Sequence, residues 1–141
     1  MPRVNIQECQ PDAYNAMFGL EKYLASSTVG ADLMEIIRIR ASTLNGCQFC
    51  IGMHREAAKS LGVSGEKIAA LANWQQSDLF SEKEIAVLTM TDSVTHISDN
   101  GLPDNVYQKA SEFFNEDEMA QLIMLMAVIN AWNRMGVSTA G

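Results

Sequence analysis

The chain contains few of the residues that interrupt helices or that cross-link small secreted domains. Its 141 residues include 3 cysteines, 3 prolines and 9 glycines. An odd set of three cysteines is too few for a disulfide-rich extracellular scaffold. Scarce proline and glycine favour long regular elements, because both residues disrupt the interiors of helices and strands. No apolar run of about 18 residues occurs, so we expect no transmembrane helix.

Positive charge is also scarce, with 10 Lys and Arg against 17 Asp and Glu and a formal net charge of −7. This balance argues against non-specific nucleic-acid binding, which requires a basic surface. Residues 1–8 lack the apolar stretch of a secretion signal, so we expect a cytoplasmic protein whose thiols are mostly reduced. The length and the 48% apolar content predict a single domain over residues 1–141, without repeats or linkers.

The hydrophobic pattern predicts an all-α fold, because no segment alternates with the two-residue period of a strand. Apolar residues at helical spacing fill residues 31–44, which end at Asn45-Gly46, a typical turn and helix C-cap signal. Residues 1–25 are ambiguous and are compatible with one additional helix. We expect six further helices, at residues 31–44, 47–61, 65–73 and 81–97, from Pro103 onward, and at residues 115–135.

Two capping boxes mark helix starts, at Ser81–Glu84 and at Asn115–Glu118, and Pro103 suits the first turn of a helix. The last predicted helix is apolar on nearly all sides between Met119 and Met135. Such a helix is buried from several directions. It therefore forms either a central core helix or part of a subunit interface, and the sequence favours neither.

The residues best suited to chemistry follow Gly46. Cys47 and Cys50 form a C-x-x-C pair at the predicted start of a helix, and His54 lies one turn after Cys50. A helix N-terminus favours a thiolate, which is the nucleophilic form of cysteine. The imidazole of His54 would face the same side and could take the thiol proton. This spacing therefore indicates cysteine-based catalysis.

Glu35 lies among apolar residues of the preceding predicted helix, 12 positions before Cys47. A buried carboxylate needs a partner. If the two helices form an antiparallel hairpin, Glu35 can reach His54 and orient its ring. The alternative is a surface glutamate paired with Arg38, three residues further along the chain.

Other interpretations of the cysteines and histidines are also compatible with the sequence. A zinc site using three protein ligands and water is compatible with this small ligand set, whereas a thioredoxin-type motif needs a preceding strand. We expect Cys9 to be a bystander that packs as a small hydrophobe. His96, the second of the 2 histidines, is expected to be structural or at the surface.

The segment from Glu35 to His54 resembles the signature of AhpD-like alkylhydroperoxidases, within the carboxymuconolactone decarboxylase superfamily. It has Glu, eleven residues, C-x-x-C, three residues and His, with Asn-Gly just before the first Cys. The combined spacing is specific, whereas a C-x-x-C alone is not. The resemblance extends through Trp74 and the closing segment Asn130–Arg134, and covers nearly the whole chain after about residue 15.

The resemblance implies an all-α helical bundle with the dithiol at the N-terminus of a central helix. Cys50 would attack the peroxide and Cys47 would resolve the resulting sulfenic acid, while His54 and Glu35 relay protons. The resemblance implies no cofactor and no metal. It also implies a hydroperoxide substrate, an external dithiol reductant such as a lipoylated or thioredoxin-like protein, and assembly into homotrimers or homohexamers.

One position departs from the resemblance. Some members carry a histidine between the two cysteines, where this chain has Phe49. We expect this change to remove a proton shuttle and to make the pocket more apolar, which either lowers the peroxidase activity or favours bulky organic hydroperoxides. The alternatives are a redox-responsive oligomer or sensor, an enzyme like the decarboxylase branch, and a zinc-bound structural oligomer. We expect Trp132-Asn133-Arg134 to serve packing.

Overall fold

The computed structural model describes residues 2–141, and every regular element in that range is helical, which confirms the all-α prediction. None of these helices is long and apolar enough to cross a lipid bilayer. The elements in chain order are α1 (Ile6–Cys9), α2 (Pro11–Ala25), α3 (Ala31–Asn45), α4 (Gln48–Ser60), α5 (Gly65–Ala70), the 3-10 helix η1 (Leu71–Gln76), α6 (Glu82–Thr95), α7 (Ile97–Asn100), α8 (Asp104–Ser111) and α9 (Glu116–Thr139).

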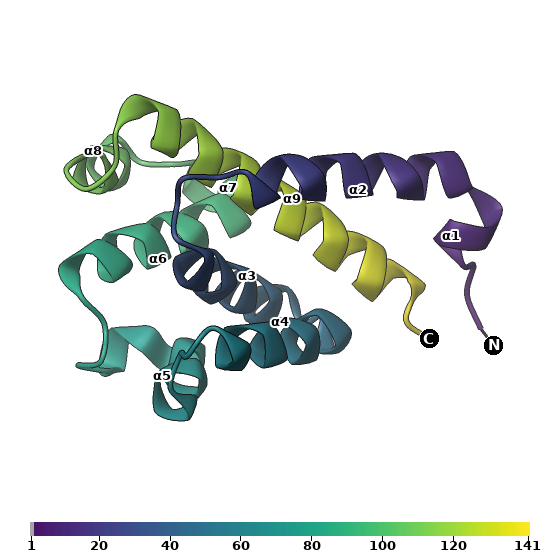
Figure 1. Cartoon of the computed structure of the whole chain (residues 1–141), viewed down its shortest axis with the longest axis horizontal. Coiled ribbons are helices and arrows are strands. Elements are labelled where there is room, and N and C mark those ends of the chain that lie inside the picture. The colour runs from purple at the N-terminus through teal and green to yellow at the C-terminus, as the bar shows by residue number, and fades with distance from the viewer. Residues whose placement is uncertain (1) are drawn as a thin grey trace.

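Helix α3 is the central element, because α4, α6 and α9 all pack against it (Figure 1). Neighbouring residues of α3 point into two different apolar clusters. Ile37 joins the cluster formed with α2, α6, α8 and α9, whereas Ile36 and Ile39 join the cluster formed with α4, α5, η1 and α6. All three isoleucines are at most 1% exposed. The consecutive isoleucines in the sequence thus reflect a helix that is covered on opposite sides.

The observed helices differ from the predicted ones mainly at their ends. The predicted helix 65–73 ends as an α-helix at Ala70 and continues as the 3-10 helix η1, whose residue Asn73 has a non-helical backbone. The final helix continues to Thr139, beyond the predicted end at residue 135. Residues 6–25 contain two helices that break at Gln10, since the residue before a proline disfavours the helical region.

The predicted start signals are confirmed in two of three cases. Ser81 and Asn115 each form a complete capping box with the glutamate three residues later. Pro103 is the residue before the first turn of α8 and has an extended backbone, so its placement inside that turn was wrong. The predicted helix 81–97 ends at Thr95 as α6, and the short helix α7 that follows ends before Gly101, where φ is 63°.

An ion pair joins three elements around the second cluster. The buried guanidinium of Arg40 on α3 binds both carboxylate oxygens of Asp92 on α6, at 2.8 and 3.0 Å. It also donates to the carbonyl oxygens of Leu71 and Ala72 in η1. The guanidinium thus makes four hydrogen bonds, which offset the free-energy cost of burying its charge.

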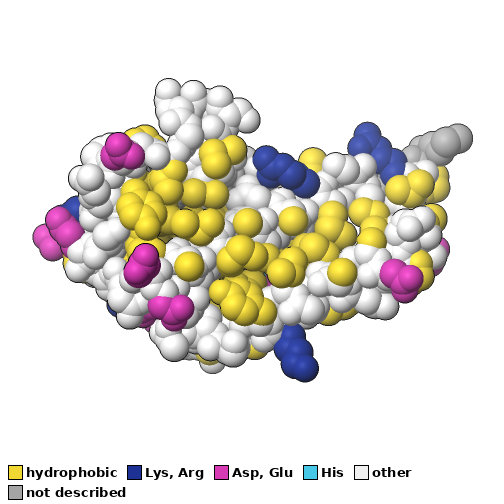
Figure 2. Space-filling model, turned by 90° about the horizontal axis from the view of Figure 1, so that it is seen from above, with side chains coloured by type: hydrophobic (Ala, Val, Ile, Leu, Met, Phe, Trp, Pro, Cys, Tyr) yellow, Lys and Arg dark blue, Asp and Glu magenta, His cyan; other side chains and the backbone are white. Residues whose placement is uncertain are grey.

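Helix α9 has a buried side and an exposed apolar side. Leu122, Leu125, Met126 and Ile129 are at most 2% exposed, which matches a core helix. Ile123 and Met124 on the other side are 39% and 37% exposed. Figure 2 shows that apolar side chains spread over the face on which α2, α8 and α9 lie.

Two lone residues of the sequence lie away from the dithiol helix α4. Cys9, in α1, is a free and exposed thiol, so the expectation that it packs as a small hydrophobe was wrong. His96 is exposed at the break between α6 and α7, which fits its expected surface role.

Candidate active site

The two cysteines of the C-x-x-C pair lie at the first turn of α4. Cys47 is the N-cap residue, and its Sγ accepts a hydrogen bond from the backbone N–H of Cys50 at 3.4 Å. The two residues are joined by a disulfide bond within the chain, with their Cα atoms 5.3 Å apart. Both are buried, at 3% and 5% exposure. The predicted position of the dithiol at a helix N-terminus is therefore confirmed.

A tight connection between α3 and α4 sets the position of Cys47. Gly46 ends α3 with φ 71°, in the left-handed region that glycine adopts without strain. The backbone N–H of Cys47 then donates to the carbonyl oxygen of Ser42 at 3.1 Å. The chain reverses within these few residues, and α4 packs back along α3. This hairpin is the arrangement that brings Glu35 within reach of His54.

Glu35 and His54 form a direct hydrogen bond between α3 and α4. The distance between Nδ1 of His54 and Oε2 of Glu35 is 2.7 Å. A carboxylate partner assigns the ring proton to Nδ1 and leaves Nε2 free to accept a proton. Cys50 and His54 lie one turn apart on the same helix face. A thiol, an imidazole and an orienting carboxylate are thus provided by two adjacent helices.

The second oxygen of Glu35 is also occupied. Nη1 of Arg38 donates to Oε1 of Glu35 at 2.9 Å. Both interpretations of Glu35 are therefore partly correct, since it pairs with Arg38 and His54 together. Its expected position on the surface was wrong, because Glu35 is only 8% exposed.

This polar chain continues beyond the residues that the sequence pointed to. Arg38 binds Glu21 of α2 at 3.2 Å, and the indole N–H of Trp132 on α9 donates to Glu21 at 2.9 Å. Side chains of α2, α3 and α9 therefore anchor the carboxylate that faces His54. Glu21 carries no local pattern that could have identified it, since it lies 14 positions before Glu35 with a loop between them.

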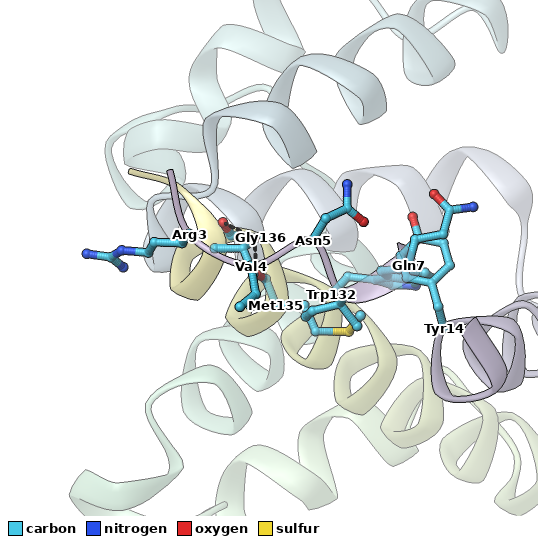
Figure 3. Close-up of a pocket in the computed structure, with 10 residues that line it drawn as sticks. Arg3, Val4, Asn5, Gln7, Tyr14, Trp132, Met135 and Gly136 are labelled. Carbon is cyan, nitrogen blue, oxygen red and sulfur yellow. Dashed lines mark hydrogen bonds between the residues drawn. The ribbon is translucent and has the colours of Figure 1, made fainter. Parts of the chain in front are cut away.

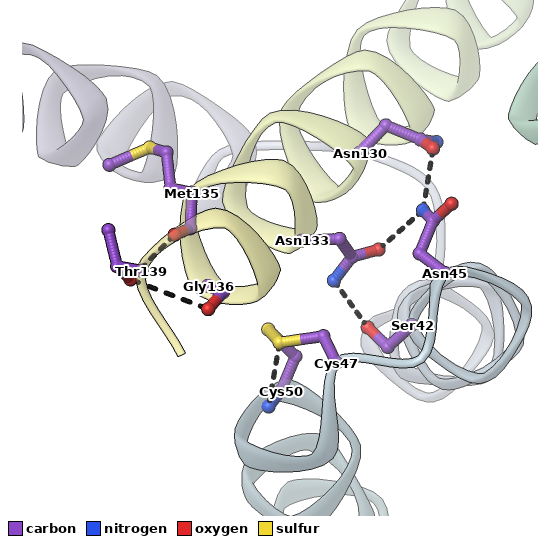
Figure 4. The surroundings of a disulfide bond; sticks show 9 residues. All are labelled: Ser42, Asn45, Cys47, Cys50, Asn130, Asn133, Met135, Gly136 and Thr139. Atoms are coloured by element: carbon purple, nitrogen blue, oxygen red, sulfur yellow. Dashed lines mark hydrogen bonds between the residues drawn. A yellow bond between two sulfur atoms is a disulfide. The ribbon is translucent and has the colours of Figure 1, made fainter. Parts of the chain in front are cut away.

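The C-terminal part of α9 lies directly against the sulfur atoms (Figure 4). A Cβ atom placed on Gly136 would lie 2.8 Å from Sγ of Cys47 and 3.7 Å from Sγ of Cys50. Only glycine fits this place without displacing the sulfur. The sequence signal was present, because a glycine inside an apolar helix costs stability and calls for a packing reason.

A network of amides fixes α9 to the turn before Cys47 (Figure 4). The side-chain amide of Asn45 donates to Oδ1 of Asn130 at 2.8 Å and to Oδ1 of Asn133 at 3.0 Å. Asn133 is fully buried and donates in turn to Oγ of Ser42 at 2.9 Å. Asn133 and Gly136 are one turn apart, so a single face of α9 holds both the turn and the disulfide. The segment Trp132-Asn133-Arg134 therefore does more than pack.

Two hollows border this centre. The larger has a volume of about 360 Å³ and lies between the N-terminal residues and the end of α9 (Figure 3). The smaller, of about 270 Å³, is lined partly by Glu21, Glu35 and Arg38. The larger one is lined by Arg3, Val4, Asn5, Ile6, Gln7, Tyr14, Trp132, Met135, Gly136 and Thr139.

Phe49 does not line either of these hollows. Its side chain projects from the first turn of α4 and is 79% exposed. In the single chain, Phe49 therefore makes neither hollow more apolar, and its effect on the substrate pocket stays a prediction. Among residues 2–141, no group of three or more His, Cys, Asp and Glu side chains is arranged to hold a metal ion.

Comparisons with known proteins agree with this architecture. Residues 11–93 match the carboxymuconolactone decarboxylase family. The uncharacterized protein YdfG of Bacillus subtilis (strain 168) is 33% identical over 136 residues, which cover 96% of this chain and 92% of YdfG. The chain therefore belongs to the carboxymuconolactone decarboxylase family.

Solved structures narrow the class within this family. A protein of unknown function from Agrobacterium tumefaciens, described as a candidate antioxidant defence protein AhpD, superposes with a TM-score of 0.95 at 32% identity, covering 99% of this chain and 95% of its own. The debrominase Bmp8 superposes with a TM-score of 0.79 at 22% identity, covering 94% of this chain and 72% of its own. The latter similarity establishes the fold alone. The protein is an AhpD-like member of the family.

Proposed function

We propose that this protein is a thiol-dependent peroxidase that reduces organic hydroperoxides through a dithiol–disulfide cycle. The observation that carries the proposal is the Cys47–Cys50 pair, buried and bonded within the chain, on the same helix as a histidine that is hydrogen-bonded to a buried glutamate. A redox-active pair needs two sulfurs within bonding reach and a way to form a thiolate. Membership of the AhpD-like class supports the same chemistry.

In the oxidising half of the cycle, Cys50 is the nucleophile. His54 takes the thiol proton through Nε2, directly or through water, while its Nδ1–H stays on Glu35. The thiolate attacks the terminal oxygen of the hydroperoxide and the O–O bond breaks, which gives a sulfenic acid on Cys50. The protonated imidazole returns its proton to the departing alkoxide, so an alcohol is released.

Cys47 then resolves the sulfenic acid. Its sulfur attacks Sγ of Cys50, water leaves, and the disulfide seen in the structure forms. A dithiol reductant, such as a lipoylated or thioredoxin-like protein, returns both cysteines to thiols. The summed reaction converts one hydroperoxide and one dithiol into an alcohol, water and a disulfide.

We also propose that the protein works as a homotrimer or homohexamer. The apolar surface on α2, α8 and α9 supports this, because Phe18, Tyr107, Ile123 and Met124 are between 37% and 50% exposed in the single chain. An exposed apolar face of this kind is typical of a surface that another subunit covers. Sedimentation at several protein concentrations tests the assembly.

Steady-state reduction of cumene hydroperoxide by excess dihydrolipoamide tests the function, with cumyl alcohol as the measured product. We expect turnover in the wild type, none in Cys47→Ser or Cys50→Ser, and a reduction of about 10²-fold or more in His54→Ala, the size of a general-base contribution. His96→Ala is the matched control, because its exposed imidazole lies outside the site, and it should keep full activity.

The same assay separates the alternatives. If peroxide forms the disulfide stoichiometrically but no turnover follows, the protein is either a redox sensor or an enzyme that requires a different reductant. If the protein converts a lactone acid, and the Cys47→Ser and Cys50→Ser variants keep this activity, the result would favour an enzyme like those of the decarboxylase branch. A comparison with hydrogen peroxide tests the substrate class, because faster reduction of hydrogen peroxide than of cumene hydroperoxide would remove the proposed preference for organic hydroperoxides.

A further inference from the structure

We propose that the reducing thiol attacks Cys50, with Cys47 as the leaving thiolate, and that Gly136 on α9 enforces this choice. This inference rests on the dithiol cycle proposed above and specifies its reductive half. The two sulfurs of a disulfide are chemically similar, so which one is attacked depends on access and on the stability of each leaving thiolate. In the structure, the two sulfurs differ both in access and in the support for a leaving thiolate.

Access differs because α9 covers one end of the disulfide. The position of a Cβ on Gly136 is 2.8 Å from Sγ of Cys47 but 3.7 Å from Sγ of Cys50. Displacement at sulfur requires the incoming thiolate to approach in line, from the side opposite the sulfur that leaves. Helix α9 therefore lies closer to the sulfur of Cys47 than to that of Cys50, and this closer cover hinders approach to Cys47 more than approach to Cys50.

Helix α9 is firmly held where it covers Cys47. One turn before Gly136, the buried side chain of Asn133 is bonded to both Ser42 and Asn45, at 2.9 and 3.0 Å. These two residues belong to the end of α3 that leads into Cys47. Moving the cover away from Cys47 would therefore break these hydrogen bonds and leave buried polar groups unpaired, which is unfavourable.

The leaving groups differ because only Cys47 occupies the N-cap of α4. Its Sγ already accepts the backbone N–H of Cys50 at 3.4 Å. The first turn of α4 contains no acidic residue, in contrast to α6 and α9, whose first turns carry two and three. The positive end of the α4 dipole is therefore available to a thiolate on Cys47.

The step is balanced as follows. A thiolate of the dithiol reductant forms a bond to Sγ of Cys50, and the electron pair of the Cys47–Cys50 bond passes to Cys47. The second thiolate of the reductant then attacks the reductant's other sulfur, which is bonded to Cys50 in the mixed disulfide, and releases Cys50 as a thiolate. The reductant leaves as a disulfide, and the two enzyme thiolates take up the two protons that its thiols lost.

The two cysteines thus have separate supports for the two halves of the cycle. The His54–Glu35 pair supports Cys50 when it attacks the peroxide, and the helix N-terminus supports Cys47 when it leaves during reduction. Cys50 would consequently form the new bond in both halves, once to oxygen and once to the sulfur of the reductant.

Trapping the mixed disulfide in the wild-type protein tests this proposal without a peroxidase assay. The protein is oxidised with diamide, mixed briefly with 2-mercaptoethanol, and quenched with excess N-ethylmaleimide. Trypsin releases residues 41–55, which contain both cysteines. Fragment ions between positions 47 and 50 then report which cysteine carries mercaptoethanol and which carries maleimide.

We expect most of the mercaptoethanol on Cys50 and the maleimide on Cys47, and the same pattern with the larger thiol glutathione. Adducts mainly on Cys47, or shared equally, would overturn the proposal. The outcome is independent of the peroxidase function, because diamide replaces the hydroperoxide. Absence of peroxide turnover with adducts on Cys50 would refute the function and leave this assignment intact.

Discussion

Replacing Gly136 by alanine tests the contact between α9 and the disulfide. The new methyl group would lie 2.8 Å from Sγ of Cys47, about 1 Å closer than the normal separation of non-bonded heavy atoms. Overpacking of this kind costs about 1–3 kcal/mol. Part of the cost is offset, because alanine in a helix is favoured over glycine by about 0.5–1 kcal/mol.

The cost applies mainly to the oxidised protein. The disulfide holds Sγ of Cys47 in place, whereas a free thiol can rotate away from the methyl group. The helix-propensity gain is the same in both states and cancels. We therefore expect Gly136→Ala to shift the equilibrium towards the dithiol by about 1–2 kcal/mol, which is a rise of about 20–40 mV in reduction potential.

Gly52→Ala is the matched control. Gly52 lies in α4, two positions after Cys50, and a Cβ on it would meet nothing within 4 Å. This variant should keep the wild-type potential and unfold at a slightly higher temperature. The potentials are measured by equilibration in dithiothreitol redox buffers, followed by alkylation and mass spectrometry. Equal potentials for Gly136→Ala and Gly52→Ala would refute the close contact.

Three further substitutions test other parts of the account. Glu35→Gln should lower the rate of hydroperoxide reduction by about 10²-fold, because His54 loses the carboxylate that orients it. Single-turnover kinetics measure this rate, and an unchanged rate would contradict the proposed proton relay. Arg40→Met should lower the free energy of unfolding in urea by about 3–5 kcal/mol by leaving the partners of a buried charge unpaired, whereas exposed Arg55→Met should change it little. Ser81→Ala should cost about 1 kcal/mol through loss of the α6 cap, and an unchanged melting temperature would contradict that role.

Local patterns in the sequence were sufficient for most of the fold. Helix α3 was predicted from its isoleucine spacing and from Asn45-Gly46, and the structure ends it at Asn45 with Gly46 in the left-handed region. Such signals act within a few residues, so they are readable without tertiary context. The break at Gln10 and the change to a 3-10 helix at Leu71 depend on finer backbone geometry, which the apolar pattern does not encode.

The candidate site likewise contains residues that local spacing predicts and residues that only the tertiary structure brings together. Cys47, Cys50 and His54 lie within eight residues of each other, so helical spacing alone placed them together. The partnership of Glu35 with His54 depended on a predicted hairpin, and the structure confirms that contact. Gly136 reaches the sulfurs from α9, and no spacing rule links residues so far apart in the chain.

Direct detection of the first intermediate tests the central claim, that Cys50 reduces the peroxide bond. The Cys47→Ser variant is reduced, treated with one equivalent of cumene hydroperoxide and trapped with dimedone. We predict one dimedone adduct on Cys50 and one equivalent of cumyl alcohol, and neither product in Cys50→Ser. Unmodified Cys50 with intact hydroperoxide, in a variant that remains folded, would contradict the account.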